Sequence, residues 1–75
     1  DLFELYPNPA NQELYVVRNT QQTVVYTILD ITGKEVQKGL ITSQMHIILL
    51  TELESGIYSI CFSNSNTMHR FIVKQ

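Results

Sequence analysis

The chain has 75 residues, of which 44% are apolar, and its five Lys or Arg against seven Asp or Glu give a formal net charge of −2. These values predict one small folded domain with no basic field for nucleic acid. No segment approaches the roughly 20 apolar residues that a membrane-spanning helix needs, and the single Cys61 excludes an intramolecular disulfide.

The first predicted element is a short strand around residues 2–5, followed by a turn that contains Pro7 and Pro9. Each proline fixes φ and pushes the preceding residue towards an extended conformation, so the chain must leave any ladder there. Asn8 stands between the two prolines and is able to hydrogen-bond the local backbone. We therefore expect a short connection before apolar alternation resumes at Leu14.

Two strands, at residues 13–17 and 24–29, carry apolar residues on both faces. This pattern is typical of strands in the interior of a sheet. Residues 30–34 then form a turn signal, in which Gly33 is free to take a positive φ. We expect a tight hairpin, with the next strand starting at Glu35.

The strand at residues 36–41 carries Lys38 and Gly39 among its apolar residues. Such residues favour an exposed strand or a sheet edge. Residues 46–51 are apolar on both faces, which predicts a strand that runs through the middle of a sheet.

A polar corner ends at Gly56 and precedes the last two strands. Gly56 suits a corner with positive φ, and Tyr58 is similar to a corner tyrosine, whose hydroxyl ties down a neighbouring loop. The closing strand, residues 67–73, places Phe71 and Val73 on one face.

Seven short strands at regular spacing, with no sustained helical period, predict the fold class. The chain is expected to be all-β, a small immunoglobulin-like antiparallel β-sandwich of about seven strands. It has neither an initiator Met nor a basic-then-apolar signal region. We therefore expect residues 1–75 to be a single module excised from a larger protein.

An ordered set of motifs spans nearly the whole chain. Its members are Tyr6-Pro7-Asn8-Pro9-Ala10, Leu14 and Val16, Asp30 to Gly33-Lys34, Ile48 and Leu50, Leu53, Gly56 and Tyr58, and a basic apolar end at Arg70–Lys74. Each motif is common by itself, but in this order and spacing they resemble the type A C-terminal sorting domain of the type IX secretion system. The chain departs from that pattern at Gln75, because the family tail usually ends in a basic residue or pair.

The resemblance implies a non-catalytic secretion signal. Proteins of this family are exported to the periplasm of Gram-negative Bacteroidota, and the C-terminal domain then directs passage through the outer-membrane translocon. The implied partners are the type IX translocon, its shuttle proteins and a surface sortase, which commonly cleaves before the domain and joins the cargo to an anionic lipopolysaccharide. The cargo is thereby secreted or held at the cell surface.

Carried over by position, the implied recognition residues are Pro7, Asn8, Pro9, Gly33, Lys34, Gly56, Tyr58, Phe71, Val73 and Lys74. We expect the last strand to present free edge groups to a receptor by strand addition, with Lys74 giving orientation. The plainer interpretation is that the prolines form a turn, that Gly56 and Tyr58 are structural, and that Phe71 and Val73 face the core. Free edges also leave a homodimer as an alternative.

No catalytic, metal or cofactor site is expected. His46 shares a strand face with apolar residues, and two separate histidines, His46 and His69, rarely form a metal site. Cys61 has no CxxC partner, glycine elbow or neighbouring base, which predicts a packed residue rather than a nucleophile.

Two other functions are compatible with the predicted fold. A carbohydrate-binding or adhesive β-sandwich module would need an exposed aromatic platform, for which Tyr15 is the best candidate, and no companion is evident. A purely structural spacer domain would leave the ordered sorting pattern as coincidence.

Overall fold

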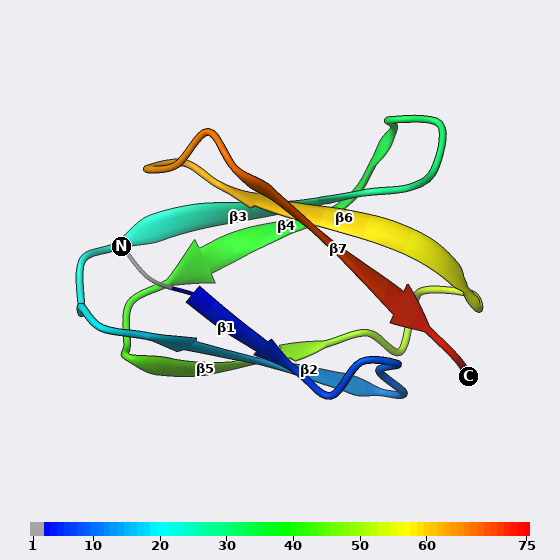
Figure 1. Ribbon diagram of the computed structural model, residues 1–75, viewed down its shortest axis with the longest axis horizontal. Coiled ribbons are helices and arrows are strands. Elements are labelled where there is room, and N and C mark those ends of the chain that lie inside the picture. The colour runs from blue at the N-terminus through cyan, green and yellow to red at the C-terminus, as the bar shows by residue number, and fades with distance from the viewer. Residues whose placement is uncertain (1–2) are drawn as a thin grey trace.

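The computed structural model describes residues 3–75, which form two layers of β-strands (Figure 1). The strands are β1 (Phe3–Tyr6), β2 (Glu13–Arg18), β3 (Val24–Leu29), β4 (Glu35–Ile41), β5 (Met45–Leu49), β6 (Gly56–Phe62) and β7 (Met68–Val73). The sheet orders are β1-β2-β5 and β4-β3-β6-β7, with antiparallel pairing throughout both sheets. The prediction of an all-β, immunoglobulin-like sandwich is confirmed, although Leu2 of its first predicted strand lies outside the described residues.

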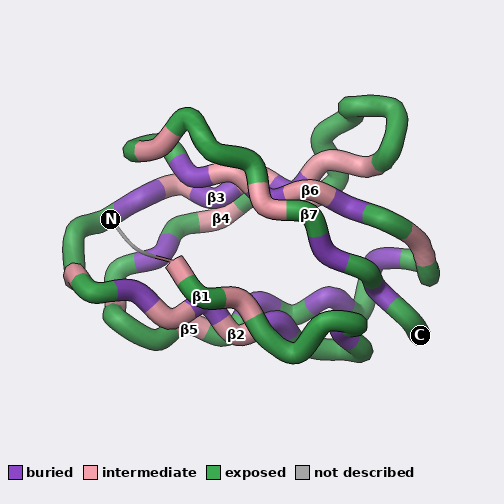
Figure 2. Tube along the Cα trace, in the orientation of Figure 1, coloured by how far each residue is buried: buried purple, intermediate pink, exposed green. Residues whose placement is uncertain are grey.

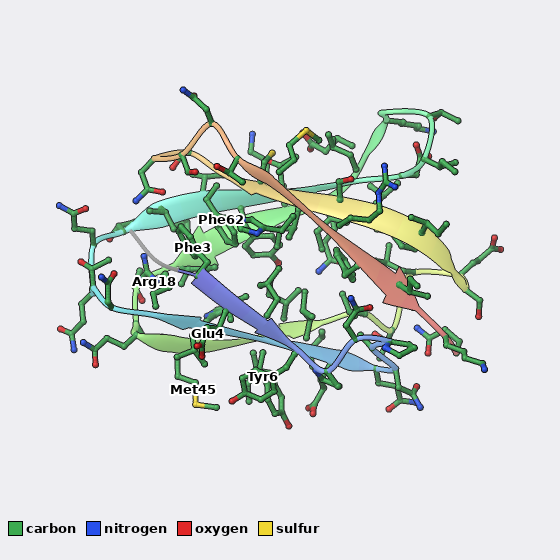
Figure 3. All side chains as sticks on the ribbon, viewed as in Figure 1. Phe3, Glu4, Tyr6, Arg18, Met45 and Phe62 are labelled. Atoms are coloured by element: carbon green, nitrogen blue, oxygen red, sulfur yellow. The ribbon has the colours of Figure 1, made fainter. Side chains whose placement is uncertain are left out.

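The core fills the space between the two sheets, because alternate residues of each strand point inward. Its buried apolar residues are Ala10, Leu14, Val16, Val24, Tyr26, Ile28, Ile41, Ile48, Leu50, Leu53, Tyr58, Ile60, Phe62, Phe71 and Val73. Figure 2 shows buried positions recurring along the strands of both layers. Phe3 of β1 stacks on Phe62 of β6 across the layers, with ring centroids 3.9 Å apart (Figure 3). A membrane-spanning helix is absent from residues 3–75.

The sheet orders test the predictions of central and edge strands. Strands β2 and β3 are central and β4 is an edge, as predicted. The prediction that β5 runs through the middle is wrong, because β5 is the edge of the three-stranded sheet. Only one face of this apolar strand is buried. Ile48 faces the core, whereas Ile47 and Leu49 lie on the outer face and are 48% and 60% exposed.

The hairpin between β3 and β4 has the predicted turn. Gly33 has φ of 88°, and its N–H donates to the Asp30 carbonyl at 3.0 Å. The Asp30 carboxylate accepts bonds from the Thr32 N–H, the Thr32 hydroxyl and the Lys34 N–H, at 2.9, 2.6 and 3.0 Å. The short acidic side chain therefore organises the turn that joins two strands of the larger sheet.

Replacing Asp30 by alanine is expected to destabilise the fold at neutral pH and much less at acid pH. The bond from Thr32, and then that from the Lys34 N–H, lowers the pKa of the Asp30 carboxyl below its ordinary value. Because the folded pKa is below the unfolded one, the stabilisation is present above the unfolded pKa and is lost as pH falls through the folded pKa. Urea unfolding of the parent and the variant between neutral pH and about pH 2 measures the gap between their free energies of unfolding. The exposed Glu52→Ala variant is the control, and a gap that persists at the lowest pH would contradict the account.

Gly39 of the edge strand β4 makes room for a buried ring, which the sequence alone did not predict. It is the cross-strand partner of Tyr26, and a Cβ at this position would lie 2.6 Å from the Tyr26 ring. Glycine thus leaves room for the buried phenol to lie against the β4 backbone. The Tyr26 hydroxyl accepts a bond from the Gln37 side-chain amide at 3.3 Å.

Within residues 3–75, Arg18 is the only charged side chain that is buried, and it is 4% exposed. Its Nε and Nη2 donate to the Ser43 carbonyl at 3.1 and 2.6 Å, and its Nη1 donates to the Gln22 carbonyl at 2.7 Å. Ser43 lies in the connection from β4 to β5, and Gln22 in that from β2 to β3. Both connections pass from one sheet to the other, so one guanidinium links two segments that join the sheets.

Candidate recognition site

Residues 7–10, the edge segment, run along the outer side of β7 and pair with it. The Ala10 N–H donates to the Ile72 carbonyl at 2.7 Å, and the Lys74 N–H donates to the Ala10 carbonyl at 2.8 Å. These bonds form a parallel bridge between Ala10 and Val73, and Ala10 is buried. A segment that follows β1 of one sheet therefore covers part of the edge of the other sheet.

Asn8 supplies a further bond between the edge segment and β7. Its Oδ1 accepts the Ile72 N–H at 3.0 Å. Pro7 and Pro9 on either side are exposed, and both are preceded by cis peptide bonds. The predicted turn is present, but the expectation that Asn8 binds local backbone is wrong, because its partner is 64 positions away along the chain.

The expectation that the last strand presents a free edge is wrong for its second half. The edge segment already binds the outward N–H and C=O of Ile72 and the N–H of Lys74. Every second residue of an edge strand directs its backbone groups to the same side, so those of Met68 and Arg70 lie on this outer edge as well. Strand addition without displacement of the edge segment is thus limited to the first half of β7.

The side chains of the last strand divide into a buried set and an exposed one. Phe71 and Val73 are each 1% exposed, which confirms the interpretation that they face the core. The Phe71 ring packs near Tyr58, with ring centroids 6.0 Å apart. Lys74 is exposed, so its ammonium group is available to a partner.

Gln75, which departs from the basic family ending, anchors the tail to the corner before β6. Its backbone N–H donates to the Ser55 hydroxyl at 2.9 Å. Its side-chain amide donates to the Leu50 and Leu53 carbonyls, both at 3.0 Å. A neutral amide satisfies these carbonyls as a donor, and no local pattern predicts this contact.

The predicted corner tyrosine is confirmed, and the predicted corner glycine is not. The Tyr58 hydroxyl donates to the Glu54 carbonyl at 2.7 Å, which ties down the preceding loop. Gly56 does not have a positive φ, because it is already the first residue of β6 and pairs with Val73 in extended geometry. A Cβ on Gly56 would meet the Tyr58 ring at an ordinary contact distance of 3.7 Å.

The structure brings most of the predicted residues to one end of the sandwich. The edge segment pairs with the tail, and the tail contacts the 50–55 corner. Lys34 and Tyr58 line one surface groove of about 440 Å³ together with that corner. Gly33 instead borders a second groove beside Ile57. In Figure 1 this is the end at which the C-terminus lies.

The histidines and the cysteine lie apart, within ordinary packing. His69 lies against the stacked Phe3 and Phe62 rings, with centroids 6.1 and 5.9 Å away. Burial, and then the Arg18 charge, lowers the pKa of His46. Cys61 is half-buried, with its Sγ 3.7 Å from the Thr27 carbonyl. Within residues 3–75, acidic, histidine and cysteine side chains form no cluster of three that could hold a metal.

Tyr15 has an aromatic neighbour that sequence reasoning missed. Tyr6 is its cross-strand partner, and the two rings meet edge to face with centroids 5.2 Å apart and an interplanar angle of 85°. Two perpendicular rings do not form the flat platform on which a sugar ring stacks. Sequence analysis misses the pair because the predicted first strand ends at Leu5, whereas β1 extends to Tyr6.

Comparisons with known proteins bear on the fold and on the family of the chain. The chain is similar over 97% of its length to part of a solved structure of PorZ, an essential bacterial surface component of the type-IX secretion system of Porphyromonas gingivalis, with 19% identity and a TM-score of 0.76. It spans 11% of that chain, and the likeness supports the fold. No curated protein matches significantly. The profile of the secretion system C-terminal sorting domain matches residues 4–74. The chain therefore belongs to the family of type IX secretion system C-terminal sorting domains.

Proposed function

We propose that residues 1–75 form one C-terminal sorting domain of a larger secreted protein and direct that cargo through the outer-membrane translocon. Its proposed partners are the translocon, the shuttle proteins and a surface sortase. The cargo then reaches the surface or the medium from the periplasm of a Gram-negative bacterium. Domains of this family are generally non-catalytic, and we propose that this one is no exception and needs no cofactor. The family match over residues 4–74 carries the proposal.

The exposed and buried residues of the candidate site suggest different roles. Pro7, Pro9 and Lys74 are exposed at one end of the molecule, where a receptor could contact them, as is Lys34 of the β3–β4 turn. Tyr58 of β6 is only 8% exposed and its hydroxyl is bonded to the Glu54 carbonyl, while Phe71 and Val73 of the tail are each 1% exposed, so these side chains offer a partner little surface while the domain is folded. We infer that the exposed set is recognised and that the buried set holds it in place.

Lys74→Glu is expected to reduce delivery of a fluorescent cargo to the surface without unfolding the domain. The exposed ammonium group forms no ion pair within residues 3–75, so its loss should change recognition more than stability. The assay measures surface and medium fluorescence in a Bacteroidota host that secretes the same fusion with the natural lysine.

Lys38→Glu is the matched control, because Lys38 is also exposed but lies on β4 at the far edge of the larger sheet. The control should be secreted normally, and both variants should keep the urea midpoint of the parent. Equal secretion of both variants would show that the lysine of the tail is not recognised.

A further inference from the structure

The outer face of the β1-β2-β5 sheet is mostly apolar. Its apolar side chains are Tyr6, Tyr15, Val17, Met45, Ile47 and Leu49. The strand register places them as neighbours, since Tyr15 pairs with Tyr6 on one side and with Ile47 on the other, and Val17 pairs with Met45. Figure 3 shows Tyr6 and Met45 directed away from the core, below the three-stranded sheet.

The three β5 side chains of this face are largely exposed. Met45 is 52% exposed, Ile47 48% and Leu49 60%. The corresponding face of the larger sheet also exposes apolar side chains, such as Leu40 at 59% and Met68 at 54%, but polar residues, among them Thr27 and Arg70, alternate with them. A contiguous apolar patch on a soluble domain marks an interaction surface more often than isolated apolar residues do.

The charges on this outer face are all negative. Glu4 pairs in register with Val17, and Glu13 with Leu49, so the two carboxylates lie at different corners of the apolar patch. The Glu13 carboxylate accepts the Tyr15 hydroxyl at 3.1 Å, and neither carboxylate has a basic partner within residues 3–75.

None of the five basic residues of the chain reaches this face. Arg18 points inward and is buried, and Lys34 lies in the β3–β4 turn. Lys38 is on β4 and Arg70 on β7, both in the other sheet, and Lys74 follows β7.

A second copy of the chain does not satisfy these charges. In a two-fold dimer that packs this face on itself, each patch residue meets another residue of the same patch. Glu4 and Glu13 would then be buried against apolar side chains or against carboxylates, which costs free energy without a compensating cation. A partner with basic groups at its rim would instead pair both carboxylates.

We propose that the outer face of the β1-β2-β5 sheet docks a protein whose contact surface is apolar and carries lysine or arginine opposite Glu4 and Glu13. This surface uses residues other than those of the proposed sorting site, so it adds a second contact to the domain. Its apolar side chains supply affinity, and its two carboxylates select a basic partner.

The test uses two synthetic amphipathic helical peptides with the same leucine face, one flanked by lysines and the other by glutamates. Amide chemical shifts of the labelled domain report binding and its location. We expect the lysine peptide to shift Tyr6, Tyr15 and Ile47 and to bind about three- to tenfold more tightly than the glutamate peptide at low salt. The preference should vanish in a chain that carries both Glu4→Gln and Glu13→Gln.

Ile47→Lys should abolish binding of the lysine peptide, and Ile57→Lys is its control, because Ile57 is similarly exposed, at 43%, on the outer face of the other sheet. Equal binding of both peptides, or no binding of either, would overturn the proposal. Sedimentation as a dimer that Ile47→Lys dissociates would assign the face to a second copy instead. Secretion of the Ile47→Lys fusion is measured separately, so failure here leaves the sorting proposal standing.

Discussion

Phe71→Ala is expected to lower the free energy of unfolding by about 3–5 kcal/mol, the range for loss of a buried aromatic side chain. Phe71 is 1% exposed and lies in the core beside Tyr58. A domain of this length has a total stability of roughly 4–11 kcal/mol, so the variant should be largely unfolded under mild denaturation. Urea unfolding followed by far-ultraviolet circular dichroism measures the change.

Ile72→Ala is the matched control for this prediction. Ile72 is the next residue of the same strand, and its side chain is 43% exposed on the outer face. Its backbone bonds to the edge segment do not depend on the side chain. We expect a loss of less than about 1 kcal/mol, and similar losses for the two variants would contradict the assigned core.

Arg18→Met is expected to cost about 2–4 kcal/mol, because it leaves the Ser43 and Gln22 carbonyls without their charged donors. Methionine keeps much of the length and apolar stem of arginine, so the change isolates the guanidinium. The bonds from Arg18 hold the two connections that cross between the sheets. Unfolding should therefore be measured together with amide hydrogen exchange in these connections, which we expect to accelerate.

The pKa of His46 gives an independent readout of the same change. Burial is the main cause that lowers this pKa, and the Arg18 charge adds to it. Removal of the charge should therefore raise the pKa part of the way towards its ordinary value, as measured by NMR titration of the imidazole. Arg70→Ala, at an exposed residue of β7, should change neither the free energy of unfolding nor the pKa of His46. An unchanged His46 pKa in Arg18→Met would contradict the effect of the Arg18 charge on this imidazole.

Local patterns predicted much of this fold. Period-two alternation located the strands, and Asp30 and Gly33 predicted the turn that the structure contains. Tyr58 was predicted correctly because a corner tyrosine bonds a carbonyl only a few residues upstream. Each of these features depends on neighbours in the sequence.

The errors concern long-range pairing. An apolar strand such as β5 can be central, or it can be an edge with an exposed apolar face, and alternation does not distinguish the two. The bond that the Ile72 N–H donates to the Asn8 side chain joins residues near opposite ends of the chain, and no local pattern predicts it. The prediction of a positive φ at Gly56 was wrong because glycine also occurs in extended backbone, and Gly56 is already the first residue of β6.

The same long-range pairing gives the candidate signal a physical form. The proline segment and the basic tail carry the resemblance at opposite ends of the chain, and the structure joins them by three backbone-directed bonds. We propose that the sorting signal is a folded surface, in which the exposed residues of 7–10 and 70–74, among them Pro7, Pro9 and Lys74, are recognised together. A receptor that instead adds a strand along all of β7 would first have to displace residues 7–10.

The most direct test of the sorting function is a secretion assay with the whole domain. A fluorescent protein with an export signal is fused to the N-terminus of residues 1–75 and expressed in a Bacteroidota host, with and without a working type IX translocon. We expect fluorescence at the surface or in the medium of the first strain and retention in the periplasm of the second. Retention in both strains would contradict the assignment of this chain as a sorting signal.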